Sequence, residues 1–271
     1  MLSLVLVAAA FATAGIGALG GLGGAVLLVP ALAVAGMPAA EAAPLGLVSV
    51  AAGSIAAGGL QLRERTVNHR LGVTTEAAAT LGATTGALGS GIVSERVLTW
   101  GLATVAVLAA AAMLRTRGRR GPGATVQDQT VGEWPGQIAG VAPPEDEPVP
   151  YRAARLPVAL ALMWVSGVIA GVAGASGGFL KTPVTTDVMR IPLKVAASTT
   201  TFTIGVTAAA GLVVFVLQGR VDPQAAAAVI AGSLLGGQVG AALQSRAPVA
   251  VIRTGLGVLL VGVAVVLVVT G

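Results

Sequence analysis

The sequence has few charged residues, few aromatic residues and no cysteine. Charged residues make up 10% of its 271 positions, whereas a soluble domain carries about 25%, so water is not the main solvent of this chain. The absence of cysteine excludes disulfides, zinc–thiolate sites and thiol catalysis. The chain also has a single histidine, which cannot build a metal site by itself. We therefore expect no metal and no cofactor.

Motifs of soluble enzymes and of nucleic-acid binding are also missing. The net charge is +5, but the basic residues lie between apolar runs, as is typical of cytoplasmic loops in membrane proteins. They are not interleaved with aromatic residues, so we expect no nucleic-acid partner. The stretch Gly15–Gly20 matches a dinucleotide fingerprint, but it follows an apolar helix and not a strand. No catalytic triad, carboxylate pair or P-loop occurs, so we expect no enzyme.

Apolar and small residues dominate what remains. Hydrophobic residues make up 55% of the chain, and 39 residues are glycine. Apolar runs long enough to cross a bilayer recur, which predicts an all-α integral membrane protein with lipid as a partner. Small residues allow helices to approach closely in lipid. The first apolar run resembles a signal peptide but lacks a basic start, so we expect a retained helix.

The chain contains two copies of one unit. The stretch "GLGGAVLLVP", ending at Pro30, is matched by "GASGGFLKTP", ending at Pro183, and beyond the prolines position n matches n+154. The repeats cover residues 1–115 and 156–271. Between them, residues 116–155 are rich in proline, glycine and charge, which predicts a mobile, hydrophilic, cytoplasmic linker. The linker is a tether or a regulatory segment.

Each repeat is expected to form five helical segments. The second segment of each is too short to span a bilayer, so segments one and two form either a re-entrant hairpin or a tilted pair of spans. The expected segments are Leu2–Leu19, Ala25–Ala35, Ala40–Leu62, Leu71–Gly91 and Val97–Leu114, then Pro157–Ala173, Phe179–Val188, Leu193–Leu217, Gln224–Leu243 and Val249–Val269.

The distribution of lysine and arginine favours inverted repeats. If each repeat crosses the membrane an odd number of times, thirteen of these residues lie inside and two outside, leaving Lys181 in the membrane. With an even number of crossings, ten lie inside and five outside. The positive-inside rule therefore favours two repeats of opposite orientation.

The glycine-rich breaks are the candidate functional sites. Backbone groups freed at such breaks need protein or a wet cavity around them, and the N-terminal ends of short helices favour anions. A lysine within a membrane segment is costly and indicates function, although Lys181 can also snorkel to an interface. Hydroxyl side chains follow it in the next helix. The expected substrate-binding residues are Lys181, Gly23, Gly24, Ser176, Gly177, Gly178, Thr182, Ser198, Thr199, Thr200, Thr201 and Ser49.

Three further features of the sequence have structural as well as functional explanations. Glu76, about five residues into its span, either carries a proton or pairs with Arg70 near the surface. Many hydroxyls merely bond backbone carbonyls or hold helices together. The glycine pairs Gly82/Gly86 and Gly236/Gly240 predict close helix crossings. Because the second repeat holds more hydroxyls, we expect it to be the main ligand-facing side.

The repeated order of glycine break, short segment ending near proline, small-residue helix and GxxxG helix resembles the sulfite exporter TauE/SafE family. The resemblance covers nearly the whole chain outside the linker. It implies a secondary transporter in the bacterial plasma membrane that exports sulfite or organosulfonates by alternating access. Lys181 fits an anionic substrate, but a carboxylate or another small oxyanion would fit equally well. The alternatives are a passive anion channel and a membrane scaffold, and a homodimer remains open.

Overall fold

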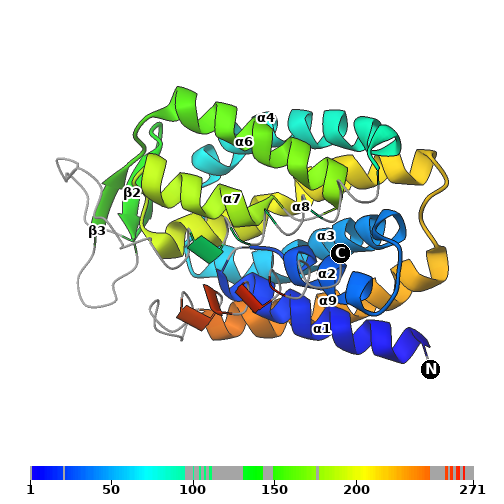
Figure 1. Cartoon of the computed structure of the whole chain (residues 1–271). Helices are drawn as coiled ribbons and strands as arrows, with labels where there is room; N and C mark the ends of the chain where they lie inside the picture. Colours follow the sequence, from blue (N-terminus) through cyan, green and yellow to red (C-terminus); the bar gives the residue numbers. More distant parts are fainter. Residues whose placement is uncertain are drawn as a thin grey trace.

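The protein is a bundle of helices with a small β-sheet at one end (Figure 1). The computed structural model describes residues 2–20, 22–94, 131–142, 149–174 and 177–244, with isolated positions at 100–111 and 254–265. The helices lie lengthwise beside one another. In this view α4 and α6 form one edge of the bundle and α1 and α9 the other.

Helices of the first repeat begin and end close to the expected residues. The expected segment Val97–Leu114 lies outside the continuously described residues. The elements are α1 (Leu2–Gly20), α2 (Ala25–Val34), α3 (Ala39–Arg63), α4 (His69–Gly89) and the short 3₁₀ turn η1 (Ser90–Ile92).

The second repeat has the same order of elements. Its short segment divides into an α-helical part and a π-helical part, a form often found at functional sites. The expected segment Val249–Val269 again lies outside the continuously described residues. The elements are α6 (Leu156–Ala173), α7 (Gly178–Pro183), η2 (Val184–Val188), α8 (Leu193–Leu217) and α9 (Pro223–Gln244).

Length and hydropathy together identify the helices that can span a membrane. Within the described residues, α3, α6, α8 and α9 are long and apolar enough to cross a membrane. The ten residues of α2 rise about 15 Å at 1.5 Å per residue, which is half of a hydrocarbon core about 30 Å thick. Helix α2 therefore reaches about half-way across: its residues from Ala25 to Pro30 are buried in the bundle, whereas Val34 at its end is exposed.

The two glycine pairs mark close helix crossings, as predicted. A side chain at Gly82 or Gly86 of α4 would collide with backbone carbonyl oxygens of α6. A side chain at Gly236 or Gly240 of α9 would collide in the same way with the backbone of α1. Small residues thus allow direct backbone contact, which takes the place of a hydrophobic driving force in lipid.

Contacts at the two ends of the bundle give the direction of each helix. At the sheet end, the backbone amide of His69 donates to Glu133 of strand β1, and the amide of Asn68 donates to Thr199 Oγ1 over 3.0 Å. Helices α4 and α8 therefore start at this end. At the opposite end, Arg220 donates to Ser90 Oγ and to the carbonyl of Ala40, both over 3.0 Å. Helices α3 and α9 start there, so α3 runs opposite to its counterpart α8.

The linker is partly folded, which differs from the expected mobile tether. Strands β1 (Gly132–Glu133), β2 (Ala139–Ala142) and β3 (Val149–Arg152) form an antiparallel sheet in the order β1-β2-β3. The sheet packs on the bundle, and this contact buries Tyr151, Ala139 and Ala142. Asn68 fixes this contact: its side-chain amide donates to Tyr151 Oη over 3.1 Å and to the carbonyl of Ala139 over 3.3 Å.

The glycine-rich breaks are sharp turns between a long helix and a short one. Gly23, before α2, has φ of 76°, and Gly174, after α6, has φ of 63°, a region that side-chain-bearing residues rarely adopt. A side chain at Gly174 would also collide with Ala43 of α3. The backbone therefore favours glycine at both turns, and packing against α3 requires it at Gly174.

Candidate functional site

A small pocket lies at the first glycine break, between α1, α2, α3 and α8. Four of its lining residues, Gly23, Gly24, Ser49 and Thr201, are among those expected from the sequence to bind substrate. None of the described residues that line it is acidic or basic. The remaining lining residues are Ala14, Ala18, Val50, Gly53, Ser54 and Ile204.

Backbone amides at the start of α2 face this region. The first amides of a helix have no partner within the helix and carry its positive partial charge. Leu27 and Leu28 donate to the carbonyl of Gly24, over 3.1 and 2.9 Å, so the first hydrogen bonds of α2 begin at the break. A side chain at Gly24 would come within 2.9 Å of Ser49 Oγ. Glycine at this position thus keeps the backbone open to the pocket.

Thr201 supplies a buried hydroxyl with no partner. Its side chain is 3% exposed, and Oγ1 makes no hydrogen bond within the described residues. A buried polar group without a partner is costly, so the hydroxyl of Thr201 has unused hydrogen-bonding capacity beside the pocket. Its neighbour Ser49 is less free, because Ser49 Oγ accepts a hydrogen bond of 2.8 Å from Ser233 Oγ.

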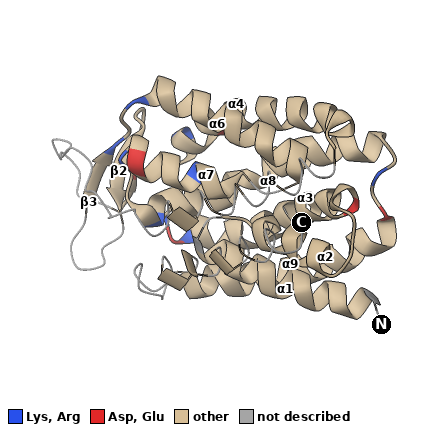
Figure 2. Ribbon diagram, viewed as in Figure 1, with Lys and Arg blue, Asp and Glu red and all other residues tan. Residues whose placement is uncertain are grey.

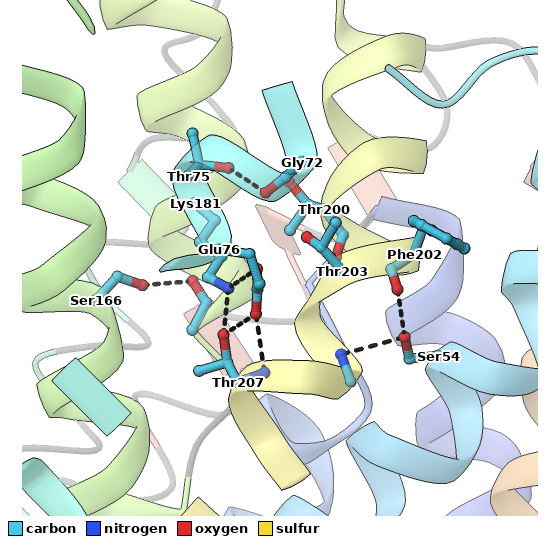
Figure 3. A network of polar contacts seen from close by, with 12 residues as sticks. Ser54, Gly72, Thr75, Glu76, Ser166, Lys181, Thr200, Phe202, Thr203 and Thr207 are labelled. Carbon is cyan, nitrogen blue, oxygen red and sulfur yellow. Dashed lines mark hydrogen bonds and ion pairs between the residues drawn. The ribbon is translucent and has the colours of Figure 1, made fainter. Parts of the chain in front are cut away.

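Ser54 inserts its hydroxyl into the backbone of α8. Ser54 Oγ donates to the carbonyl of Thr201 over 2.6 Å and accepts from the amide of Gly205 over 3.2 Å. These two backbone groups are four residues apart, the spacing of a normal helical hydrogen bond. Insertions of this kind loosen a helix locally. Ser54 of α3 therefore fixes the position of α8 next to the pocket (Figure 3).

Lys181 is buried in an ion pair and not in contact with the pocket. Its side chain is 2% exposed, and Nζ lies 2.7 Å from Glu76 Oε2 and 2.7 Å from Thr207 Oγ1. Glu76 Oε1 accepts from the amide of Thr207 over 2.8 Å and from its hydroxyl. Figure 3 shows these three side chains pointing toward one another from α7, α4 and α8. Snorkelling of Lys181 and pairing of Glu76 with Arg70 were thus both wrong.

The other expected residues occupy different places. Thr199 lies at the sheet end, where its hydroxyl accepts from Asn68, and Ser166 Oγ donates to the carbonyl of Gly177 over 2.7 Å. Gly178 starts α7, a helix of six residues. Ser198, Thr200 and Thr182 are buried, and Ser176 lies outside the described residues. The structure therefore places four expected residues at the pocket and Lys181 in the ion pair, and the other described ones lie outside both.

Sequence reasoning missed the residues that complete these two places. Ser54 and Thr207 complete the pocket and the ion pair, and both lie in runs of small residues that gave no sign of their partners. The pocket is lined by eight residues of the first repeat and by Thr201 and Ile204 of the second, whereas the second repeat was expected to be the main ligand-facing side. That expectation stays a prediction. The repeat could have related the two places, because Gly53 of the pocket and Thr207 of the ion pair occupy equivalent positions in the two repeats, as do Ser54 and Ala208.

Charged residues gather at the sheet end of the bundle (Figure 2). Among the described residues, one arginine, Arg220, lies at the opposite end, near Glu41 and Asp222. Seven lysines and arginines lie at the sheet end, namely Arg63, Arg65, Arg70, Arg152, Arg155, Arg190 and Lys194.

A bundle of membrane-length helices with a polar pocket at a broken helix is the architecture of a membrane transporter. Comparison with known proteins agrees: the model of the family "Sulfite exporter TauE/SafE" matches residues 6–267. The chain belongs to this family. It is also similar to the "Probable membrane transporter protein YunE" of Bacillus subtilis (strain 168), at 33% identity over 89 residues. That match spans 33% of this chain and 33% of the relative. No solved structure matches.

Proposed function

We propose that this protein exports sulfite or a related sulfur-containing organic anion from the bacterial cytoplasm by alternating access. The observation that carries the proposal is the pocket, where the unpartnered hydroxyl of Thr201 lies beside the glycine break that starts α2. The sulfur anion and the outward direction are drawn from the name of the family.

The chemistry of the pocket suits an oxyanion. Amides at a helix start and hydroxyl groups donate hydrogen bonds to anionic oxygens, and the lining contains no carboxylate to repel them. The pocket is small in this conformation, so the anion enters only when the surrounding helices move. Alternating access supplies that movement.

The directions of the helices support an inverted-repeat transporter. Helices α3 and α8 correspond in the repeat but start at opposite ends of the bundle. The contacts correspond as well, since α1 packs along α9 as α6 packs along α4. Two equivalent units of opposite orientation are the usual frame for alternating access around a central site.

Charge supports an orientation in which the sheet end faces the cytoplasm. Seven lysines and arginines lie at that end, against one at the other, within the described residues, and cytoplasmic loops carry the excess of positive charge. The linker is then cytoplasmic. Export of an anion from a cell with a negative interior is electrically downhill by about 2.3 kcal/mol per charge at 100 mV.

Flux through purified protein in liposomes tests this function. Sulfite, thiosulfate, sulfoacetate and acetate are each loaded inside, and efflux is followed with and without the same anion outside. We expect saturable efflux of one or more of the sulfur anions and accelerated exchange with that anion on both sides. Flux that neither saturates nor shows counterflow would indicate a channel. No flux of any of the four would leave a scaffold as the better interpretation.

A further inference from the structure

We propose that Glu76 is a proton-binding site, and that one proton bound there crosses the membrane with each anion. The inference rests on the proposed function and adds its coupling ion. The group concerned is the buried set of Glu76, Lys181 and Thr207, which the pocket does not include.

The ion pair lies deep in the bundle and joins the two repeats. Glu76 is 6% exposed and belongs to the first repeat, whereas Lys181 and Thr207 belong to the second. Removing two charges from water is costly, and a buried pair is weak evidence for stability. Ionisable residues within membrane segments usually mark ion or proton pathways. The corresponding positions in the repeat are Ile230 and Leu28, so packing alone does not require the charges.

Lys181 is the one charged side chain that faces Glu76 within the described residues. Helix α6, which packs along α4, contains no titratable residue. On α8 the titratable residue is Lys194, thirteen positions before Thr207, or about 20 Å along the axis. In η2, Asp187 is exposed. The charge state of Glu76 therefore decides whether the positive charge of Lys181 is compensated.

The proton changes the net charge of the group from zero to positive. A proton taken from the aqueous phase binds the carboxylate of Glu76, which becomes neutral, and Lys181 stays an ammonium ion. The uncompensated positive charge then attracts an anion into the bundle. Loss of the anion on the far side makes Glu76 release its proton there, because the carboxylate again pairs with Lys181. Anion and proton thus bind and leave together.

Helix α8 connects the proton site to the pocket. The amide of Gly205 donates to Ser54, a pocket residue, and the amide of Thr207, two residues further on, donates to Glu76. Thr201 and Thr207 are six residues apart, about 9 Å along the axis. Protonation of Glu76 weakens the hydrogen bond that its carboxylate accepts from the amide of Thr207. The segment of α8 between Thr201 and Thr207 then loses one of the contacts that fix its position.

An imposed pH gradient tests the coupling. Liposomes hold equal sulfite, or in a second arm equal sulfoacetate, inside and outside, and the interior is made acidic. Sulfoacetate keeps its charge between pH 6 and pH 8, since a carboxyl group titrates near pH 4. We expect net anion movement toward the alkaline exterior with the wild-type protein. In Glu76→Gln, anion exchange continues, but the response to the gradient falls at least tenfold.

Two further variants and the wild type serve as controls for the pH-gradient experiment. Glu76→Asp keeps a titratable group and should keep the response, and Glu41→Gln, at an exposed carboxylate outside the site, should match the wild type. Wild-type flux that ignores the pH gradient in both arms would overturn the proton site and leave the export function standing, whether or not the glutamine variant folds. A normal gradient response in Glu76→Gln would also overturn it. No flux in either arm would refute both proposals.

Discussion

A single hydroxyl distinguishes the pocket from an ordinary crossing of polar helices. Most of the described threonines in the bundle bond a backbone carbonyl in their own helix, as Thr75 does with Leu71 over 2.8 Å. The hydroxyl of Thr201 has no hydrogen-bond partner in the part of the chain that the structure describes. Helices in lipid use hydroxyls as adhesive, but a hydroxyl that has no partner contributes nothing to adhesion. The proposed function assigns it a partner, the transported anion.

Thr201→Val should weaken anion transport while preserving the fold. Valine has the shape of threonine, and the lost hydroxyl leaves no protein group unpaired. A hydrogen bond to a charged group is worth about 1.5–3 kcal/mol, so KM for the transported anion should rise by about ten- to a hundredfold. The measurement is efflux from liposomes as a function of anion concentration.

Thr80→Val is the matched control for this measurement. Thr80 Oγ1 is also buried without a partner, but Thr80 lies on α4, outside the pocket. KM should therefore stay at the wild-type value in this variant. An equal rise of KM in both variants would mean that general packing, and not the pocket, is responsible.

At the residue scale, the sequence predicted which residues matter better than it predicted their partners. Lys181 was singled out because a lysine is costly in lipid, and Glu76 because it lies within a span. Their pairing was missed, since 105 positions separate them and no local pattern relates them. Likewise, a run of hydroxyls gave no means of selecting Thr201, because the orientation of α8 decides which hydroxyl reaches the pocket.

At the scale of elements, helices followed the sequence closely and the linker did not. Long apolar runs bounded by proline or charge, as in α8, leave little choice of structure in a membrane. Strands of two to four residues give almost no periodic signal, and the prolines around them suggested a tether. The sheet forms because it docks: Tyr151 and Ala139 are covered by the bundle, which the linker sequence alone does not reveal.

Packing of the sheet on the bundle should raise the pKa of Tyr151, the one tyrosine of the chain. Burial raises the pKa of Tyr151 from 10.0 to about 12, Glu133 adds to this, and the hydrogen bond from Asn68 opposes it. The folded state thus holds the phenol proton more tightly. The resulting stabilisation is complete below pH 10 and is lost as pH rises from 10 to about 12.

The near-ultraviolet absorbance of tyrosinate measures this pKa directly in purified protein. We expect half-titration near pH 12, with Tyr151→Phe as the baseline. Half-titration near pH 10, with the bundle still folded, would mean that Tyr151 is exposed to water and the sheet does not stay docked.

At the scale of the whole molecule, the orientation in the membrane can be tested with few changes. The chain has no cysteine, so single substitutions carry the only thiol. Gln137→Cys places it in the exposed turn of the sheet and Gln224→Cys at the opposite end of the bundle. In spheroplasts, a membrane-impermeant maleimide should label Gln224→Cys and leave Gln137→Cys unlabelled until the membrane is permeabilised. The reverse pattern would contradict a cytoplasmic sheet.

The repeat pattern predicted the two halves, but not how they interlock. Contacts between halves depend on which faces of the helices meet, and the glycine pairs indicated close approach without naming the partner. In the structure each glycine-lined crossing pairs a helix of one half with a helix of the other, α4 with α6 and α1 with α9. A half-chain therefore lacks the partners of its own outer helices.

This interlocking constrains the biogenesis of the protein. Helix α1 is synthesised before α9, and the other described helices lie between them in the chain, so α1 cannot contact its partner until those helices have been synthesised. Until then its glycine-rich face is open to lipid or to the insertion machinery. The contact between α1 and α9 therefore forms only after α9 has been synthesised, and a truncated translation product has no half that is complete in itself.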